Sequence, residues 1–214
     1  MKIIIQCAGS KNTNAGYFKT KEGKPIKFVA APNQCNHEEG FIYQHPDDFS
    51  ERGISWKEEL LEYNIENENN YNLLPAYKLY KNNIYRALVE KFGVENIFIL
   101  SAGWGLIRSD FLMPVYNITF SSSRKCIKRY IKDSWHDLNM LPNSSDNVIF
   151  LGGKNYLQMF NDITKNYKGK RIVFYNSDIK PHLNNNCEII RFNTMRKTNW
   201  HYECAEKLIT GELL

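Results

Sequence analysis

The segment ILSAGWGLIRSDFLMP, residues 99–114, leaves a predicted buried strand through a turn in which Gly103 and Gly105 flank Trp104. Glycine permits a positive φ or the close approach of another backbone. A tryptophan in such a turn can present a face on which an unstacked nucleic-acid base packs, a contact worth ~1–3 kcal/mol. The other interpretation places Trp104 in the core, and the residue types alone leave both open.

An acid follows in the same segment, since Asp110 lies five residues after Gly105 and ahead of Tyr116 and Asn117. An enzyme that breaks an N-glycosidic bond uses a carboxylate near the sugar, which orients water and stabilises the cationic transition state. Tyrosine can hold the base and asparagine can read its polar edge. We therefore predict catalytic roles for Asp110 and Asn117, with a turn-capping role for Asp110 as the alternative.

The first predicted strand ends in CAGSK, residues 7–11. A small-residue loop directly after a strand can point backbone N–H groups and a lysine at a phosphate. The segment lacks the GxxxxGK[ST] spacing of a Walker loop, and an ordinary strand-exit turn is the alternative. The residues that we predict to contact the base or its sugar are Ser10, Gly103, Trp104, Gly105 and Tyr116.

Two further loops combine cations with residues suited to DNA. FLGGKNY, residues 150–156, joins a strand to a helix start and carries Lys154 near that helix N-terminus, where a phosphate can bind. RFNTMRKTNWH, residues 191–201, precedes another helix. A plain strand–helix turn and a solvated basic loop capped by Thr198 or Asn199 are the alternatives. The predicted DNA-binding residues are Lys11, Arg108, Lys154, Arg196, Lys197, Asn199 and Trp200.

Metal and nucleophile chemistry have little support in the sequence. Cys35, His37 and His45 lack a fourth ligand at a familiar zinc spacing, so we predict no metal site. Ser101 lies at a strand end without a nucleophile elbow, which argues against Ser-His-Asp catalysis. The chain has five cysteines, an odd number, without a CxxC pair. The cysteines that we predict to be reduced are Cys7, Cys126, Cys187 and Cys204.

Composition narrows the class of protein. The 214 residues are 43% hydrophobic and 14% aromatic, which is typical of a globular fold with a substantial core. The net charge of +5 permits an anionic partner such as nucleic acid without requiring one. The N-terminal apolar run is too short for a signal peptide, and no stretch reaches the ~20 apolar residues of a membrane span. We expect a cytoplasmic protein with no membrane partner and no obligate protein partner.

Short apolar runs alternate with amphipathic helical patterns along the chain. The predicted strands cover residues 2–6, 96–101, 147–151, 171–175 and 188–192, and the predicted helices cover 75–92, 155–165 and 200–209. This alternation predicts an α/β protein with three layers, a largely parallel sheet and helices on both faces. Residues 12–72 are polar, aromatic and turn-rich, with one helix around 55–63. We interpret them as a loop-rich insertion over the carboxyl ends of the strands, within a single domain of residues 1–214.

Several separated blocks of the sequence resemble one bacterial family along nearly the whole chain. These blocks are QCAGSK, HPDDFSERGISWKEELLEYN, LLPAYKLYKNNIYRALVEKFG, FILSAGWGLIRSDFLMPVYNITFS, FLGGKNYLQMF and TNWHYECA. The family is similar to the YaaA peroxide-stress proteins, and the wider set resembles the uracil-DNA glycosylase superfamily and the glycosylase-like domain of archaeosine synthases. The sequence departs from these in placing Val115 before Tyr116 and in lacking the GQDPYH and HPSPLS signatures.

The resemblance implies a base-excising anti-phage DNA glycosylase, a monofunctional hydrolase that removes glucosylated hydroxymethylcytosine from phage DNA and leaves abasic sites. It implies no metal and no cofactor, and a target base flipped into a pocket between Trp104 and Tyr116. Two other classes of function remain open: a non-enzymatic DNA-binding stress protein, and an enzyme related to tRNA-base transglycosylases. A glycosylase with lyase activity, in which Lys11 or Lys154 forms a Schiff base, is a variant of the first.

Overall fold

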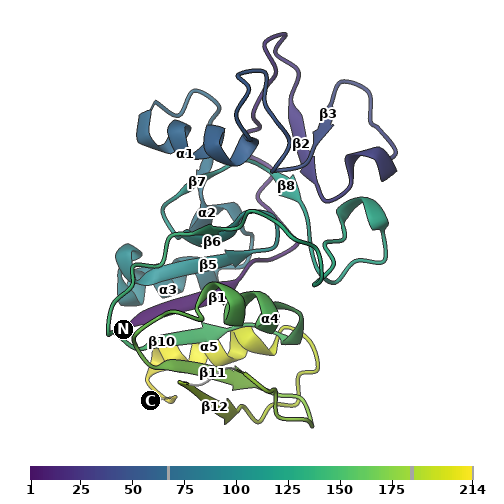
Figure 1. Cartoon of the computed structure of the whole chain (residues 1–214). Helices are drawn as coiled ribbons and strands as arrows, with labels where there is room; N and C mark the ends of the chain where they lie inside the picture. Colours follow the sequence, from purple (N-terminus) through teal and green to yellow (C-terminus); the bar gives the residue numbers. More distant parts are fainter. Residues whose placement is uncertain (67, 184–185, 214) are drawn as a thin grey trace.

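The computed structural model describes residues 1–66, 68–183 and 186–213, and they form an α/β protein (Figure 1). The strands of its main sheet are β1 (Lys2–Gln6), β5 (Ile97–Ser101), β6 (Gly105–Arg108), β9 (Leu138–Asn139), β10 (Val148–Leu151), β11 (Arg171–Tyr175) and β12 (Cys187–Arg191). Within the described ranges these seven strands have the order β12-β11-β10-β1-β5-β6-β9. Each neighbouring pair runs parallel except β5 and β6, which are antiparallel. The predicted α/β class with a largely parallel sheet is confirmed, and the sheet is mixed.

The central strands form where the sequence has continuous apolar runs. Ile3, Ile4 and Ile5 of β1 are fully buried, as are Ile149 and Phe150 of β10. A strand covered on both faces must be apolar at every position, so it shows a continuous run in place of an alternating pattern. The five predicted strands match β1, β5, β10, β11 and β12 to within about one residue at each end.

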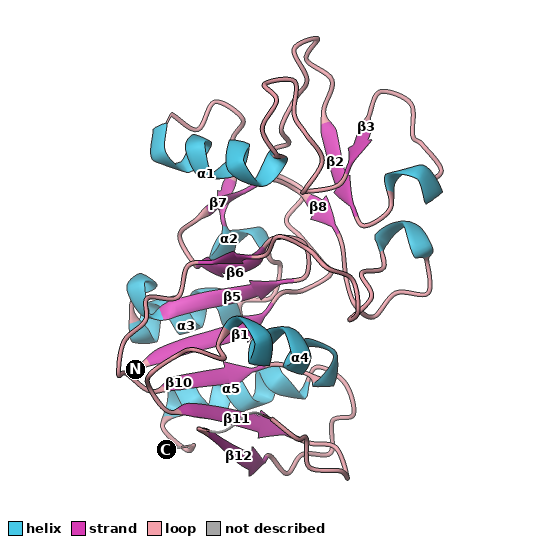
Figure 2. Ribbon diagram, viewed as in Figure 1, coloured by secondary structure: helices cyan, strands magenta, loops and turns pink. Residues whose placement is uncertain are grey.

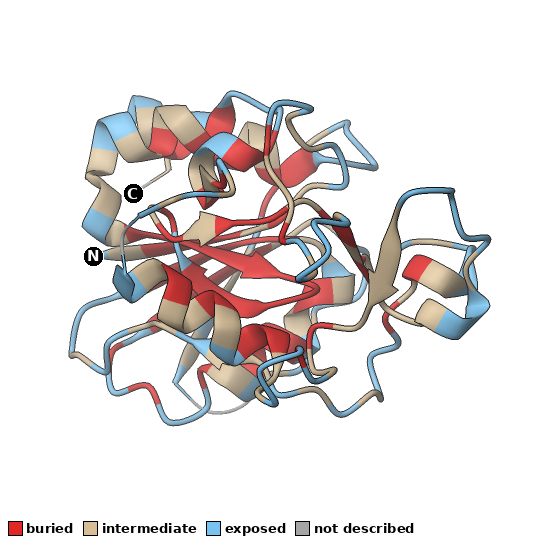
Figure 3. Cartoon of the chain, turned by 90° about the horizontal axis from the view of Figure 1, so that it is seen from above, coloured by how far each residue is buried: buried red, intermediate tan, exposed pale blue. Residues whose placement is uncertain are grey.

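Helices cover both faces of the sheet (Figure 2). α3 (Ile84–Phe92) and α5 (Trp200–Thr210) pack side by side on one face, and α4 (Lys154–Ile163) lies on the other. Seen from above, the buried sheet lies between these helices (Figure 3). α3 ends where the sequence predicts, because Gly93 adopts a φ of +86° that an L-residue rarely takes.

The prediction of one helix over residues 75–92 is wrong. The structure has a short α2 (Ala76–Leu79) and a separate α3, with an irregular connection around Tyr80. Backbone groups there bond to the loop after β1: the N–H of Asn12 donates to the carbonyl of Leu79 at 2.7 Å, and the N–H of Lys81 donates to the carbonyl of Ser10 at 3.2 Å. These bonds replace those of a continuous helix and hold Tyr80 against the exit of β1.

The insertion at residues 12–72 has more regular structure than a set of loops. β2 (Ile26–Val29) pairs in parallel with β3 (Ile42–Gln44) and with β8 (Tyr116–Asn117), which belongs to the segment after the glycine turn. α1 (Trp56–Glu66) begins at a capping box in which Ser55 and Glu58 bond reciprocally to each other's backbone N–H. The insertion also contains η1 (Pro32–Gln34). Short elements elsewhere in the chain are the antiparallel pair β4 (Leu74–Pro75) and β7 (Leu112–Met113), η2 (Val94–Asn96) and η3 (Lys125–Ile127).

The topology marks one place in the sheet as a ligand site. From β1 the sheet extends to β5 on one side and to β10, β11 and β12 on the other. Chain connections therefore leave the carboxyl ends of β1 and β10 in opposite directions and open a crevice between them, where open α/β sheets bind ligands. Among the described helices, none is long and apolar enough to cross a membrane.

Candidate functional site

A pocket of about 610 Å³ lies beside the exit of β1, between the sheet edge and the insertion. The sheet-edge wall holds Lys11 together with Tyr116 and Asn117 of β8. The structure thus brings together three of the side chains that the sequence predicts for the site. Ser10 lies next to Lys11 and is exposed, but it is not among the residues that line the pocket. The remaining lining residues are Gly9, Tyr17, Lys27, Val29, Gln34, Asn36, Glu38, Tyr43, Val115, Arg124, Lys125, Cys126 and Ile127.

Lys11 is held tightly in this wall. Its Nζ atom donates to the carbonyl of Ala8 at 3.2 Å and to that of Gly9 at 3.4 Å, and it lies 4.0 Å from the centroid of the Tyr116 ring. Burial lowers the pKa of Lys11 to about 8. The two carbonyl oxygens and the ring face favour the charged form, so the ammonium predominates at neutral pH.

A buried network of hydroxyl groups fixes Tyr116 beneath Lys11. Ser101 at the end of β5 donates to the Tyr116 hydroxyl at 2.9 Å, and the hydroxyls of Tyr80 and Tyr116 lie 2.9 Å apart. The Ser101 Oγ atom accepts in turn from the backbone N–H groups of Gly103 and Trp104. Burial raises the pKa of both tyrosines well above the usual range, so both phenols stay neutral and act as hydrogen-bonding groups.

Cys7 extends this network to the neighbouring strand. Its Sγ atom lies 3.2 Å from the Tyr156 hydroxyl, at the start of α4, and accepts from the backbone N–H of Ala102 at 3.4 Å. Cys7 and Tyr156 are both buried. The contact links the carboxyl ends of β1, β5 and β10 under the crevice. It also explains why the residue directly after β1 is a cysteine, whose side chain is small and weakly polar.

The predicted stacking role of Trp104 needs correction. Its side chain is fully buried and makes edge contacts with Phe28 of β2, at 4.9 Å between centroids, and with Tyr116, at 6.4 Å. An indole enclosed in this way has no open face for a base. Trp104 instead joins the insertion to the sheet, as the alternative interpretation from the sequence held.

The glycines of the turn serve the same packing. Gly105 has a φ of +95°, and a Cβ atom there would lie 2.3 Å from the carbonyl oxygen of Leu138. A Cβ on Gly103 would lie 3.0 Å from the Ile118 side chain. Both glycines are buried under the pocket wall and do not line it, so the structure assigns them to close packing in place of substrate contact.

The structure also corrects the predicted location of Asp110. Because β6 runs antiparallel to β5, Arg108 lies opposite Phe98, and the N–H of Ser109 bonds to the carbonyl of Ile97 at the amino end of β5. Asp110 therefore lies at the opposite edge of the sheet from Lys11. Its carboxylate accepts two hydrogen bonds from Arg108, at 2.9 and 2.7 Å, and both side chains face solvent.

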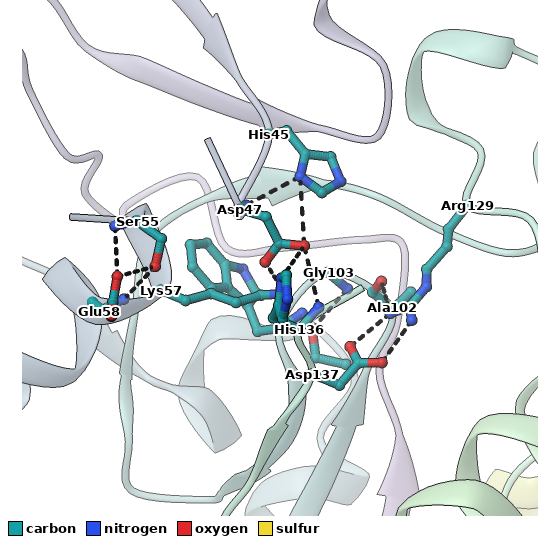
Figure 4. Close-up of polar contacts among 12 residues, drawn as sticks. His45, Asp47, Ser55, Lys57, Glu58, Ala102, Gly103, Arg129, His136 and Asp137 are labelled. Atoms are coloured by element: carbon teal, nitrogen blue, oxygen red, sulfur yellow. Dashed lines mark hydrogen bonds and ion pairs between the residues drawn. The ribbon is translucent and has the colours of Figure 1, made fainter. Parts of the chain in front are cut away.

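A second polar cluster, which the sequence did not single out, links the insertion to the glycine turn (Figure 4). Arg129 donates to both carboxylate oxygens of Asp137, at 2.8 and 2.6 Å, and to the carbonyl of Ala102 at 3.1 Å. Nearby, Lys57 is nearly fully buried and pairs with Asp47 at 2.7 Å. Burial works to raise the pKa of Asp47, but the hydrogen bond and charge of Lys57, together with the other hydrogen bonds and charges around the carboxylate, outweigh it, and the pKa of Asp47 is lowered. No local pattern in the sequence marked Arg129 as part of a site.

A second pocket of about 750 Å³ lies over the carboxyl ends of β10 and β11. Its lining residues include Lys154, Arg196, Lys197, Asn199 and Trp200, so the structure gathers five of the seven predicted DNA-binding residues here. The helices α4 and α5 both begin at this pocket, and helix N-termini attract phosphate.

Two of the seven need separate comment. Trp200 is only 5% exposed and stacks on Phe192 at 5.9 Å, so its ring is part of the core and has no face free for a base. Arg108 lies with Asp110 at the opposite edge of the sheet. The side chain that does protrude is Met195, which is 99% exposed next to Arg196.

The cysteines differ from the prediction at one point. Cys35 in the insertion forms a disulfide with Cys126, which was predicted to be reduced, whereas Cys7, Cys187 and Cys204 are free. The pair could not be recognised from the sequence, because the partners are 91 positions apart and only the folding of the insertion onto η3 brings them together. The disulfide also uses Cys35, which the sequence offered as a potential metal ligand.

Comparisons with protein-family models, with curated proteins and with solved structures gave no match to this chain.

Proposed function

We propose that this chain is a DNA N-glycosylase that hydrolyses the bond between deoxyribose and a bulky modified base. The observation that carries the proposal is the 610 Å³ pocket at the carboxyl edge of the sheet, where Lys11, Tyr116 and Asn117 meet in one wall. A concave site with a few convergent polar groups and a lysine of shifted pKa is the usual form of an active site.

The distribution of cations supports DNA as the partner. Lys11, Arg124 and Lys125 line the first pocket, and Lys154, Arg196 and Lys197 line the second. The two pockets are neighbours along the carboxyl edge, because Asn155 of the second bonds to Ser121, in the segment that leads to Arg124. DNA lying along this edge places its phosphates on both groups of cations while one nucleotide turns into the first pocket.

The chemistry that we assign needs only water from outside the chain. Hydrolysis joins a water oxygen to the anomeric carbon and breaks the carbon–nitrogen bond. The electron pair of that bond leaves with the base, and the proton that the water loses ends on the base. The Lys11 ammonium stabilises the negative charge that develops on the departing base. The Asn117 amide, exposed in the same wall, orients the water or the polar edge of the base. Asp110 has no role in this scheme.

The size of the pocket favours a modified base over an ordinary one. Sites that enclose drug-sized ligands start at ~300 Å³, and this pocket has about twice that volume. We propose glucosylated hydroxymethylcytosine in phage DNA as the substrate, and a fold related to the uracil-DNA glycosylases and YaaA. The sequence blocks support that relation. The order of the five parallel strands, which is 2-1-3-4-5 when they are numbered along the chain, is compatible with it and is common among doubly wound α/β proteins.

The test is base release from DNA. Purified protein is incubated with phage DNA that carries glucosylated hydroxymethylcytosine and with unmodified DNA. Released bases are read by mass spectrometry and abasic sites by alkaline cleavage. We expect release from the modified DNA only, slowed by about 10²-fold or more in Lys11→Met because a preorganised charge is lost. Asp110→Asn is the control and should retain the wild-type rate.

Each other outcome points to a different function. Binding of DNA without base release contradicts the glycosylase proposal and favours the non-enzymatic binder. Release of a base from structured RNA but not from DNA favours an enzyme related to tRNA-base transglycosylases. A covalent adduct trapped by borohydride shows a Schiff base and overturns the monofunctional mechanism.

A further inference from the structure

The two walls of the first pocket have different chemistry. The sheet-edge wall presents the ammonium of Lys11 over the Tyr116 ring, with Asn117 beside it. The opposite wall comes from the insertion and presents neutral amides, phenols, one carboxylate and one lysine. Its polar side chains are Tyr17, Lys27, Gln34, Asn36, Glu38 and Tyr43.

Part of the insertion wall has free hydrogen-bonding capacity. Among the contacts of the described residues, the side chains of Tyr17, Gln34 and Asn36 make no hydrogen bond, and Gln34 and Asn36 are exposed. Amides donate and accept at once, as hydroxyl groups do. A wall of this composition matches a ligand that carries several hydroxyls.

The same wall is rigid, which lowers the entropic cost of binding. Cys35 lies between Gln34 and Asn36, and its disulfide with Cys126 fixes both to the segment at η3. The backbone N–H of Ala31 donates to the carbonyl of Cys126 at 2.9 Å, and the rings of His37 and Tyr43 are stacked at 4.7 Å.

The positively charged side chains of the pocket do not conflict with a ligand that carries several hydroxyls. Lys27, the cation within the insertion wall, is paired with Glu38 and lies 3.8 Å from the centroid of the Phe41 ring. Its charge is therefore compensated locally. Arg124 and Lys125, at the start of η3, line the pocket but are exposed, so they can meet a DNA backbone.

We propose that the insertion wall reads a hexose attached to the target base, with Gln34 and Asn36 as the specificity-determining residues and Glu38 as a further acceptor. The inference rests on the proposed glycosylase function and deepens it, because the base ring occupies the side of Lys11 and Asn117 while its sugar faces the insertion. The disulfide fixes the backbone that carries Gln34 and Asn36. Discrimination between a glycosylated and a bare hydroxymethyl base arises at these residues, and Lys11 is common to both.

Binding measured without catalysis tests the inference. Two duplexes differ in one nucleotide, which is glucosylated hydroxymethylcytosine in the first and hydroxymethylcytosine in the second. Both carry a 2′-fluorine on the target sugar, which disfavours a cationic transition state and keeps the base attached. The readout is the ratio of the two dissociation constants. We expect the wild type to bind the glucosylated duplex about tenfold or more tightly, as several neutral hydrogen bonds would provide.

The variants Gln34→Ala and Asn36→Ala should each reduce this ratio by about fivefold while leaving the affinity for the hydroxymethyl duplex unchanged. Asn33→Ala is the matched control, since Asn33 is exposed in the same turn but does not line the pocket. Glu38→Gln is compared with Glu39→Gln in the same way. A wild-type ratio near one, or variants that keep the wild-type ratio, would overturn the inference.

Failure of the proposed function gives a different pattern. The first case is that no base is released from unfluorinated DNA, but the ratio of the two dissociation constants and its decrease in Asn36→Ala are as expected. This result would support hexose recognition by the insertion wall and contradict the glycosylase proposal. If bases are released at the same rate with and without the hexose, and the ratio is near one, the glycosylase proposal stands and the inference falls.

Discussion

The Nζ atom of Lys11 lies 4.0 Å from the centroid of the Tyr116 ring. Lys11 belongs to the loop after β1 and Tyr116 to β8, which pairs with the insertion, so this contact joins the sheet edge to the insertion at the pocket. Burial places the pKa of Lys11 at about 8, close enough to neutrality for its charge to change in an accessible pH range.

Base release should therefore fall at alkaline pH. Lys11 is protonated below pH 8 and neutral above it, so the charge that stabilises the departing base is lost as the pH rises through about 8. We expect kcat/KM to decline by about tenfold per pH unit above that value. Lys11→Arg keeps its charge at alkaline pH, so any activity that it retains should not decline above pH 8. If kcat/KM of Lys11→Arg declines in the same way as that of the wild type, the titrating group is not Lys11.

The buried and exposed arginine–aspartate pairs should differ in their contribution to stability. Arg129 is 5% exposed and also bonds to Ala102, whereas the side chain of Arg108 is 57% exposed. Arg129→Met removes the buried partner of the Asp137 carboxylate, which is itself only 16% exposed, and we expect a loss of about 3 kcal/mol in the free energy of unfolding. Arg108→Met should cost less than about 1 kcal/mol. Urea unfolding measures both, and equal losses would contradict the difference in burial.

Stability should decrease at mildly acidic pH because of His201. This side chain is 2% exposed, and burial lowers its pKa to about 4. Between pH 6.5 and 4 the unfolded chain binds the proton and the folded chain does not, so its contribution is complete above pH 6.5 and is lost as the pH falls. At pH 5 the loss from this group is about 2 kcal/mol.

His201→Phe removes that titration. Urea unfolding at pH 7 and pH 5 gives the change in stability for the wild type and the variant, and the difference between the two changes isolates His201. The wild type should lose about 2 kcal/mol more than the variant. An equal loss in both would place the titration elsewhere.

The disulfide should stabilise the fold as well as the pocket. It closes a loop of 91 residues, and cross-links of this length contribute about 2–5 kcal/mol. Cys35→Ser combined with Cys126→Ser should lower the free energy of unfolding by that amount and shift thermal unfolding to lower temperature. Cys187→Ser, at a free and half-buried cysteine, is the control. A double variant as stable as the control would show that the bond is not formed in solution.

The local sequence pattern alone was enough to predict the strands of the core and the end of α3. The apolar runs at residues 2–6 and 171–175 are strands with the predicted bounds, because a short β-branched or aromatic run has no better way to bury both of its faces. Gly93 ends α3 because its positive φ suits glycine. Lys11 was singled out from its place after a predicted strand, and Tyr116 and Asn117 were singled out from their residue types; the structure brings the three together in the sheet-edge wall.

Long-range packing decided the parts of the site that the sequence misplaced. Asp110 and Arg108 lie at the far edge because β6 folds back along β5, and nothing in the local residues distinguishes that hairpin from a crossover that would keep the acid near Lys11. Trp104 is enclosed because Phe28, distant in the sequence, packs against it. The insertion wall of the pocket and its disulfide likewise depend on partners 91 residues apart, which meet only when the whole chain has folded. Secondary structure is determined by residues that are neighbours along the chain. The residues that line a pocket are determined by tertiary packing, in which distant segments come together and exclude water.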